Sequence, residues 1–426
     1  MTDMFSGCRV LLVSTNYAPE HAGIAPYATL TAEHLAASGA DVDVLTGMPH
    51  YPGWRVHADY RGRWRMVESR GGVRVHRRRS FVPTRQTALL RAAYEAGFLA
   101  HGSIRPPAAR PDLVLSQMPT LAGGVIGGRI ARRHRVPHVV VVQDLMSAAA
   151  AQSGIRGGGR VASVVAGVES RILRTAALIG VVHESFVDRV TAMGVPGSRV
   201  RVVPNWSHVT PPTGDRRAVR ARLGWRDEEF VLLHAGNMGL KQGLEILVET
   251  ARIAHRDTPR LRIVLMGDGS QRRHLEHLAA DLPNLHFLPP AAHADFPDVL
   301  AAADLLALTQ RASVGDMSLP SKLTSYFASG RPTVASVASQ GGTAQEVRRS
   351  GAGVLVRAED PVALHGSVVE LMRDPDRSAA LGARGPAYVR ERLSPEAGLG
   401  RITAVVSEAL AHSAREPEAR PASDAR

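Results

Sequence analysis

The feature that most restricts the fold is a series of short, uninterrupted apolar runs separated by helix-like segments. In the first half we predict strands at Val10–Ser14, Val42–Thr46, Leu113–Ser116, Val139–Val142 and Leu178–Val182. In the second half we predict strands at Val231–Ala235, Ile263–Met266, Leu305–Leu308 and Val334–Ser336. Continuous runs of Val, Leu and Ile are typical of parallel strands buried on both faces. Their alternation with helices predicts an α/β protein with doubly wound parallel sheets.

The chain length of 426 residues exceeds that of an ordinary single domain and suits two large α/β domains. The first half closes with Pro204–Trp206, and the polar, proline-containing stretch Ser207–Asp215 is typical of a linker. We therefore expect one domain over residues 1–206 and a second over about 215–380. The last residues are mostly Pro, Glu, Arg and Ala, which predicts a disordered tail over 413–426.

Unusual residues follow the predicted strands, at the end where open parallel sheets bind their ligands. They are the segments Asn16–Tyr27 and Met48–Trp54, then Gln143, Asp144 and His183, and in the second half Gly236–Gly239 and Gly267–Gly269. Two doubly wound domains whose functional ends face each other imply one interdomain cleft.

Lysine is rare in this chain. Lys and Arg total 52 residues, yet only Lys241 and Lys322 are lysine. Both lie in loops between a predicted strand and a predicted helix, and a glycine-bearing turn of that kind with a lysine is a natural phosphate site. We expect both side chains to be solvent-accessible and to need a compact ammonium group rather than a planar guanidinium. The alternative is that lysine survives at these two loops by chance.

The composition bears on the compartment and on partners. Cys8 is the only cysteine, which excludes an internal disulfide framework and fits a reducing compartment. No secretory signal pattern opens the sequence, and no apolar run approaches the ~20 residues of a spanning helix. We therefore expect a cytoplasmic protein, with a peripheral position at the inner face of the cell membrane as an open alternative.

The net charge of +13 is concentrated in part between Arg61 and Arg79, where eight arginines occur. Such a run fits an anionic membrane surface or a phosphate-bearing acceptor, or it is simply a solvated basic face. Aromatic residues make up only 4% of the chain and no stacking platform accompanies the run, so we predict no nucleic-acid partner. Leu90, Tyr94 and Phe98 share one helical stripe, which is either a membrane-docking face or part of the core.

Several common motifs are missing. The segment Gly123–Gly128 lies in a helix-like run and lacks the spacing of a dinucleotide-binding loop. No Walker lysine motif, zinc-ligand spacing or nucleophile elbow is present. No paired-carboxylate metal site is evident, so we expect no obligatory metal and no cofactor.

The combination of motifs resembles the retaining glycosyltransferases of family 4. It consists of Asn16–Glu20, Gly236–Gly239, Gly267–Gly269, Leu319–Gly330 and Arg331–Ala335. Pro49–Trp54 and Pro204–Trp206 further resemble the colanic-acid and O-antigen exopolysaccharide enzymes of that family. The resemblance runs from about Arg9 to about Leu410. It implies a GT-B fold, in which a C-terminal helix over about 381–412 completes the first domain.

The resemblance also implies a donor site for a nucleotide-diphosphate sugar. Gly23 would approach the donor diphosphate from the first domain, and the strand ending at Leu288 would frame the base. The loop that contains Pro320, Ser321 and Ser325 would reach the ribose and phosphates.

The chain departs from the wider family at several positions of this site. They are Asn237 in place of an arginine, Gln242 in place of a lysine one residue after Lys241, Met317 and Ser325 in place of two glutamates, and Gln143 in place of a histidine.

From these residues we expect a transferase that moves a sugar to a hydroxyl of a lipid-linked or polysaccharide acceptor. Lys241 and Lys322 would stabilise the leaving diphosphate, with backbone donors at the glycine turns that include Gly236, Gly267 and Gly269. Retention of anomeric configuration is implied by the family alone. The rivals are a nucleotide-sugar epimerase on the same fold and a basic nucleic-acid-binding module.

Other candidate site residues keep two interpretations. Asp144 is catalytic or caps a helix. His50 contacts sugar or packs within its loop, and Tyr51 and Trp54 of the same loop are candidates for sugar or acceptor contacts. His183 is a structural histidine or a base. Gln143 is a further candidate for a sugar or acceptor contact. Glu346 reaches a sugar hydroxyl or is a solvated helix residue.

Overall fold

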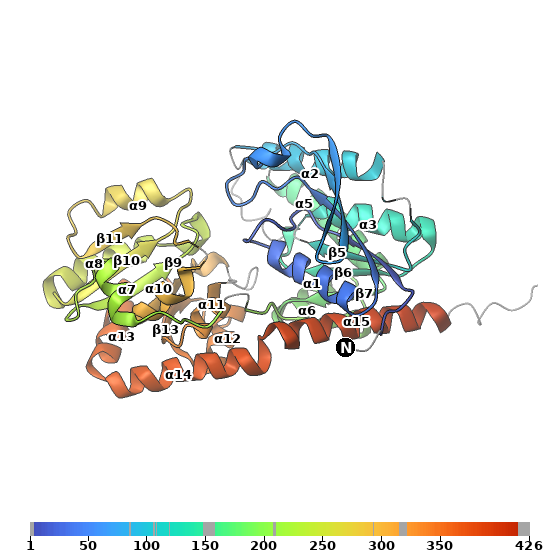
Figure 1. Ribbon diagram of the computed structural model, residues 1–426. Coiled ribbons are helices and arrows are strands. Elements are labelled where there is room, and N and C mark those ends of the chain that lie inside the picture. The colour runs from blue at the N-terminus through green and yellow to red at the C-terminus, as the bar shows by residue number, and fades with distance from the viewer. Residues whose placement is uncertain are drawn as a thin grey trace, which may run out of the picture. The chain divides into compact units, whose positions relative to one another are not determined.

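The computed structural model describes residues 4–84, 87–104, 107, 109–118, 120–147, 158–207, 210–292, 294–314 and 322–415. The chain divides into two compact units (Figure 1). The first unit comprises Met1–Pro204 and Gly398–Arg426, and the second comprises Asn205–Ala397. Each unit has its own sheet with helices packed on it.

The first unit contains an eight-stranded sheet in the order β3-β4-β2-β1-β5-β6-β7-β8. Its strands are β1 (Arg9–Val13), β2 (Asp41–Gly47), β3 (Arg65–Arg70), β4 (Val73–Arg78), β5 (Leu113–Met118), β6 (His138–Val142), β7 (Leu178–Val181) and β8 (Val200–Val202). All pairs are parallel except β3 with β4. The five strands predicted in this half are confirmed. The apolar runs miss β3, β4 and β8, because β3 and β4 are mostly polar and β8 is very short.

The centre of this sheet is β1, which is paired on both sides. Val10 lies opposite Val42 of β2 and Leu113 of β5. Val10 and Leu12 are completely buried, because helices lie on both faces of the sheet. The helices of the first unit are α1 (Ala25–Ala37), α2 (Ala88–Ile104), α3 (Leu121–His134), α5 (Gly158–Thr175), α6 (Ser185–Ala192) and α15 (Pro395–Arg415), with short 3-10 turns η1 (Ala58–Tyr60) and η2 (Gly197–Arg199).

The second unit contains a six-stranded parallel sheet in the order β11-β10-β9-β12-β13-β14. Its strands are β9 (Phe230–Ala235), β10 (Leu261–Met266), β11 (Leu285–Leu288), β12 (Leu305–Thr309), β13 (Thr333–Val337) and β14 (Gly353–Arg357). The four predicted strands are confirmed, and β11 and β14 are additional edge strands. The strand order reverses between β9 and β12, which is where doubly wound sheets bind ligands.

The helices of the second unit cover both faces of this sheet. They are α7 (Arg216–Arg222), α8 (Glu245–Asp257), α9 (Arg272–Leu278), α10 (Phe296–Ala302), α11 (Lys322–Ala328), α12 (Gly342–Ser350), α13 (Pro361–Arg373) and α14 (Pro375–Arg392), with short 3-10 turns η3 (Leu240–Gln242) and η4 (Ala312–Val314). Buried side chains form one cluster with α7, α10, α11, α12 and α14, and another with α8, α9 and α13.

The C-terminal helical region differs from the prediction of one helix over about 381–412 in the first domain. It consists of α14, which belongs to the second unit, and α15, which belongs almost entirely to the first. A Cβ on Gly385 of α14 would lie 2.4 Å from the carbonyl oxygen of Phe327, so this helix packs closely on α11. In the first unit, Arg201 pairs with Glu408 of α15. The helix continues to Arg415, past the predicted start of the tail at 413, and residues 416–426 lie outside the described ranges.

The interpretation of the arginine run between Arg61 and Arg79 as a uniformly exposed basic face is wrong. Its later part is strand β4, which has neighbours on both sides, so alternate side chains are covered. Arg77 is completely buried, forms an ion pair with Glu68 and donates hydrogen bonds to the carbonyl oxygens of Gly47 and Ala18. Arg78 is 8% exposed. These two arginines cannot contact a membrane, whereas Arg79 is exposed.

The apolar stripe on α2 is core rather than a docking face. Phe98 is buried at 1% exposure against Leu11 and Val13 of the sheet. Tyr94 is buried at 2% exposure against the rings of His50 and Trp54, and Leu90 is half-buried. Within the described ranges, no helix combines the length and the apolar character needed to cross a membrane.

Candidate functional site

The loop after β9 carries the predicted glycine turn and lies at the reversal of strand order in the second sheet. Two backbone hydrogen bonds tie it to the loop after β10: Met238 N–H donates to Asp268, and Gln271 N–H donates to Met238. Gly236 and Gly267 have φ angles of 126° and 142°, and a Cβ on Gly267 would lie 1.9 Å from the Gly236 carbonyl oxygen. Only glycine allows this contact. The structure thus brings the predicted glycines, including Gly269, into one constellation.

Lys322 lies at the start of α11 and reaches the same loop. Its Nζ is 3.2 Å from Nε2 of His234, and it is the atom nearest to a Cβ placed on Gly236, at 3.3 Å. The His234 Nδ1–H donates to the Ala307 carbonyl oxygen at 3.3 Å, so Nε2 is the nitrogen left to accept a hydrogen bond from the lysine. His234 is completely buried and was not predicted, because within an apolar strand its only signal is its position just before the glycine loop.

The surroundings of Lys322 lower its proton affinity. Burial lowers the pKa of the Lys322 ammonium from 10.5 to about 7. Burial, and then the neighbouring lysine, also lowers the pKa of His234 well below its usual value. The prediction that both lysines are solvent-accessible is confirmed for Lys241, which is exposed, whereas Lys322 is half-buried and keeps only part of its surface in contact with solvent. An anion placed beside Lys322 would favour its charged form.

Lys241 is carried by η3, which is anchored to the end of β12. Arg311 N–H donates to the Lys241 carbonyl oxygen at 3.0 Å, and Thr309 Oγ1 donates to the Gln242 carbonyl oxygen at 2.7 Å. Gln242 Oε1 in turn accepts from Gly239 N–H at 3.1 Å. Gln242, which stands where the wider family has a lysine, thus closes the loop upon itself. Lys241 and the exposed Asn237 are left on the solvent side of the loop.

Arg272 of α9 is a further residue that the sequence analysis missed. Its Nη1 donates to the carbonyl oxygens of Gly267 and Leu288, and its guanidinium lies 6.0 Å from the ring centroid of Phe287. The arginine therefore ties the end of β11, where Leu288 was predicted to frame a base, to the glycine turn after β10. No motif signals this role, because it depends on the adjacency of β10 and β11.

The other predicted residues of the second unit take different positions. Ser325 is buried in α11 at 4% exposure. Glu346 of α12 is 5% exposed and accepts a hydrogen bond from the Tyr388 hydroxyl at 2.5 Å, so its interpretation as a solvated helix residue is wrong. Pro320, Ser321 and Met317 lie outside the described residues.

In the first unit, a buried carboxylate organises the aromatic loop after β2. Glu20 is 4% exposed, and its Oε1 accepts from the backbone N–H groups of His50 and Tyr51, each at 2.7 Å. The His50 ring is 1% exposed and packs between the rings of Trp54 and Tyr94, at centroid distances of 5.6 and 5.4 Å. This arrangement matches loop packing for His50. Glu20 ends the motif Asn16–Glu20, but its positioning role emerges only from the structure.

The remaining predicted residues of the first unit lie near this loop. A Cβ on Gly23 would be 3.0 Å from the Tyr51 ring. Burial raises the pKa of Tyr51, and the charges of Glu20 and Asp144 raise it further against the opposing effect of a nearby arginine, so Asp144 is within electrostatic reach.

At the neighbouring strand ends, Glu169 rather than Asp144 accepts the N–H groups of Met146 and Ser147. Gln143 is buried, and its Nε2 is 3.5 Å from Gln117 Oε1. His183 is also buried and is hydrogen-bonded locally to Ser185. Among the residues that the structure describes, no three or more His, Cys, Asp or Glu side chains gather into a group that could hold a metal ion.

The low pKa of Lys322 predicts how stability depends on pH. Between about pH 7 and about 10.5 the unfolded chain holds a proton that the folded lysine has released, so stability rises with pH over this window. Below about pH 7 the cost of enclosing the charge is fully present. The change Lys322→Met removes that cost, so we expect the melting temperature of the variant relative to wild type to fall as pH rises from about 6.5 to about 9.

The measurement is differential scanning calorimetry across this pH range. Lys241→Met is the matched control, because Lys241 is exposed, and its difference from wild type should not change with pH. If the difference in melting temperature between Lys322→Met and wild type is as independent of pH as that of the control, the lowered pKa of Lys322 is contradicted.

Comparison with known proteins assigns the family. Residues 22–206 match the family described as Glycosyl transferase 4-like domain, and residues 229–374 match Glycosyl transferases group 1. The Escherichia coli (strain K12) protein WcaI, whose name assigns it to colanic acid biosynthesis as a glycosyl transferase, is 31% identical over 335 residues, covering 76% of this chain and 81% of WcaI. D-inositol 3-phosphate glycosyltransferase 1 of Catenulispora acidiphila is 28% identical over 380 residues, 85% of each chain.

Solved structures agree in fold. Sucrose-phosphate synthase from Thermosynechococcus elongatus superposes with a TM-score of 0.73 at 18% identity, covering 95% of this chain and all of the other. Anabaena HepE in complex with UDP-glucose superposes with a TM-score of 0.66 at 19% identity, covering 94% of this chain and 99% of the other. The resemblance drawn from the motifs is confirmed: this protein is a glycosyltransferase of GT-B fold and belongs to the family that joins a glycosyl transferase 4-like domain to a glycosyl transferases group 1 domain.

Proposed function

We propose that this glycosyltransferase moves a sugar from a nucleoside-diphosphate sugar to a hydroxyl of a lipid-linked or polysaccharide acceptor. The observation that carries the proposal is the constellation of Lys322, Lys241 and the glycine turns at the strand-order reversal of the second sheet. In this proposal the second unit holds the donor and the first unit binds the acceptor. The names of relatives support a nucleotide-sugar donor and a polysaccharide pathway, since HepE was crystallised with UDP-glucose and WcaI is named for colanic acid biosynthesis.

The chemistry of the step explains the residue types. When the bond from the sugar to the diphosphate breaks, negative charge grows on the leaving diphosphate, and cations or N–H donors already in place lower the barrier. Lys322 supplies an amine whose protonated form a bound anion would favour, and Lys241 supplies an exposed ammonium. The glycine turns leave room for phosphate oxygens to approach the backbone, because no side chain covers it.

Three further parts belong to the proposal. Transfer proceeds with retention, which nuclear magnetic resonance of the product's anomeric proton tests.

The transfer reaction needs no metal, so full activity should persist in excess EDTA. The enzyme works in the cytoplasm, and its acceptor is presented at the inner face of the membrane. The single cysteine Cys8 supports the reducing compartment.

A thermal-shift screen of UDP-, GDP-, dTDP- and ADP-sugars tests donor binding. A ligand at about 100 times its dissociation constant stabilises the folded state by about 2.7 kcal/mol, which a melting curve detects readily. We expect one nucleotide class to raise the melting temperature of the wild type and to do so much less in Lys322→Met. No shift with any of the four donors would contradict the proposal.

Incubation with the donor alone separates transfer from the rival epimerase reaction. An epimerase would convert the nucleotide-sugar without an acceptor, whereas a transferase needs an acceptor for turnover beyond slow hydrolysis. Chromatography of the nucleotide-sugar pool before and after acceptor addition reads the difference.

A further inference from the structure

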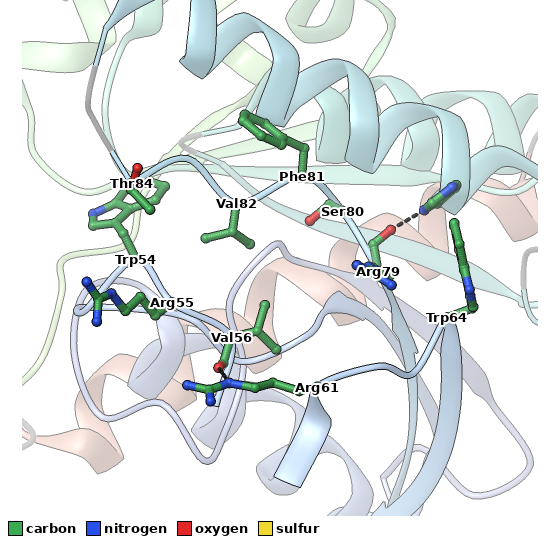
Figure 2. Close-up of a pocket in the computed structure, with 11 residues that line it drawn as sticks. Trp54, Arg55, Val56, Arg61, Trp64, Arg79, Ser80, Phe81, Val82 and Thr84 are labelled. Carbon is green, nitrogen blue, oxygen red and sulfur yellow. Dashed lines mark hydrogen bonds between the residues drawn. The ribbon is translucent and has the colours of Figure 1, made fainter. Parts of the chain in front are cut away.

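A pocket in the first unit is lined by residues other than those proposed to hold the donor. It has a volume of about 570 Å³, within the range of small-molecule sites. Figure 2 shows that the loop after β2, with Trp54 and Arg61, and the segment after β4, with Arg79 and Phe81, lie around it. Trp64 completes the wall beside Arg79.

The pocket holds the tryptophans that this chain leaves accessible. Of four tryptophans, Trp206 and Trp225 are buried at 2% and 3% exposure. Trp64 is 66% exposed and Trp54 is half-buried, and both line the pocket. Phe81, another lining residue, is 47% exposed. A concentration of accessible aromatic surface in a concave site points to a ligand with an apolar part.

The polar side of the pocket is cationic. Arg55, Arg61 and Arg79 are exposed lining residues, and no carboxylate is among the described residues of the lining. The Arg79 guanidinium lies 5.0 Å from the ring centroid of Trp64, and Arg61 Nε donates to the Val56 carbonyl oxygen at 3.0 Å. Within the described ranges neither Arg61 nor Arg79 forms an ion pair, in contrast to Arg77 on the same hairpin.

These donors and acceptors select the chemistry of the ligand. Arginine only donates hydrogen bonds, so it binds groups that accept them, and phosphate fits its planar fork. The lining has no carboxylate or carboxamide side chain, and beside the arginines its polar side chains are Ser80, Thr84 and His101. Trp54, Trp64 and Phe81 offer apolar surface beside the cations. The ligand that fits both sides is a phosphate attached to a hydrocarbon chain.

We propose that this pocket binds the lipid end of the acceptor, with its phosphate at Arg61 and Arg79 and the first part of its hydrocarbon chain against Trp54, Trp64 and Phe81. This inference rests on the proposed transferase function and selects a lipid-linked acceptor rather than a free polysaccharide. It also gives the arginine run a specific purpose. The buried Arg77 joins β4 to β3 through its ion pair with Glu68, and the exposed Arg61 and Arg79 contact the ligand.

Farnesyl phosphate, a short isoprenoid with one phosphate, is the probe, and intrinsic tryptophan fluorescence is the readout because Trp54 and Trp64 line the pocket. We expect saturable binding of farnesyl phosphate, and much weaker binding of farnesol or of inorganic phosphate alone. Equal affinity for farnesol would overturn the role of the arginines. Equal affinity for inorganic phosphate would overturn the role of the aromatic wall.

Paired variants locate the site. The double variant Arg61→Gln with Arg79→Gln should bind farnesyl phosphate at least about ten-fold more weakly, because two charge-assisted contacts are lost. Arg63→Gln with Arg70→Gln is the control, since it removes the same charge from exposed positions of the same segment outside the lining. Trp64→Leu, followed by calorimetry, should also weaken binding. An equal loss in the control and the pocket variant would overturn the proposal.

Two further results separate this proposal from others. Vesicle binding that depends on Arg61 and Arg79, without binding of monomeric farnesyl phosphate, would make the surface a membrane contact and would overturn the pocket. Donor thermal shifts are measured on the same variants and should stay unchanged. A wild type that shows no donor shift contradicts the proposed function, whereas the farnesyl phosphate titration tests the pocket alone.

Discussion

Replacing Lys322 by alanine is expected to lower the rate of sugar transfer by about 10²–10³-fold, because the change removes a cation from the developing diphosphate charge. The Nζ of Lys322 lies 3.2 Å from Nε2 of His234 and beside Gly236, at the glycine turn proposed to hold the diphosphate. Lys241→Ala should also lower transfer strongly, although its ammonium is exposed and solvent screens it more. Steady-state kinetics with the donor identified by the thermal-shift screen measures both effects.

Arginine substitutions at the two lysines separate charge from geometry. Lys322→Arg should recover little activity, because a bulky planar guanidinium must enter a niche where Nζ is already 3.2 Å from His234. Lys241→Arg should recover more, since η3 holds that side chain in open solvent. Full activity of Lys322→Arg would show that lysine survives there by chance. Circular dichroism of each variant checks that the fold is intact.

Replacing Gly267 by alanine is expected to abolish donor binding while most of the fold remains. The added Cβ would lie 1.9 Å from the Gly236 carbonyl oxygen, at a φ of 142° that side chains rarely adopt. The loops after β9 and β10 must then separate, which displaces the backbone beside Lys322. We expect the donor-induced rise in melting temperature to disappear, which corresponds to a dissociation constant for the donor at least about ten-fold higher.

Gly366→Ala is the matched control for this change. Gly366 lies in α13, where a Cβ would meet nothing within 4 Å, so alanine should be neutral or should stabilise the helix by up to about 1 kcal/mol. Donor affinity should be unchanged in this variant. Donor binding by Gly267→Ala as tight as that of the control would contradict the close contact between the two loops.

The sequence determined the two α/β sheets and placed the candidate site residues after the ends of their strands. All nine predicted strands are present, because continuous Val, Leu and Ile runs are stable only when both faces are covered. It also indicated the glycine turns at Gly236 and Gly267, since backbone at a positive φ favours a residue without a side chain. The family could also be predicted from the sequence, because its motifs are short local segments that can be recognised without the fold.

Contacts between distant segments were decided only by the tertiary structure. Arg77 looked like part of a basic face, yet β4 has a strand on each side and Glu68 from the adjacent strand neutralises it. The same is true of Lys322, whose burial beside His234 joins positions 88 residues apart. The local sequence shows the charge and polarity of a side chain. Its burial depends on which distant segment packs against it. Burial in turn changed the interpretation of both cations, because it alters the free energy of the charged form.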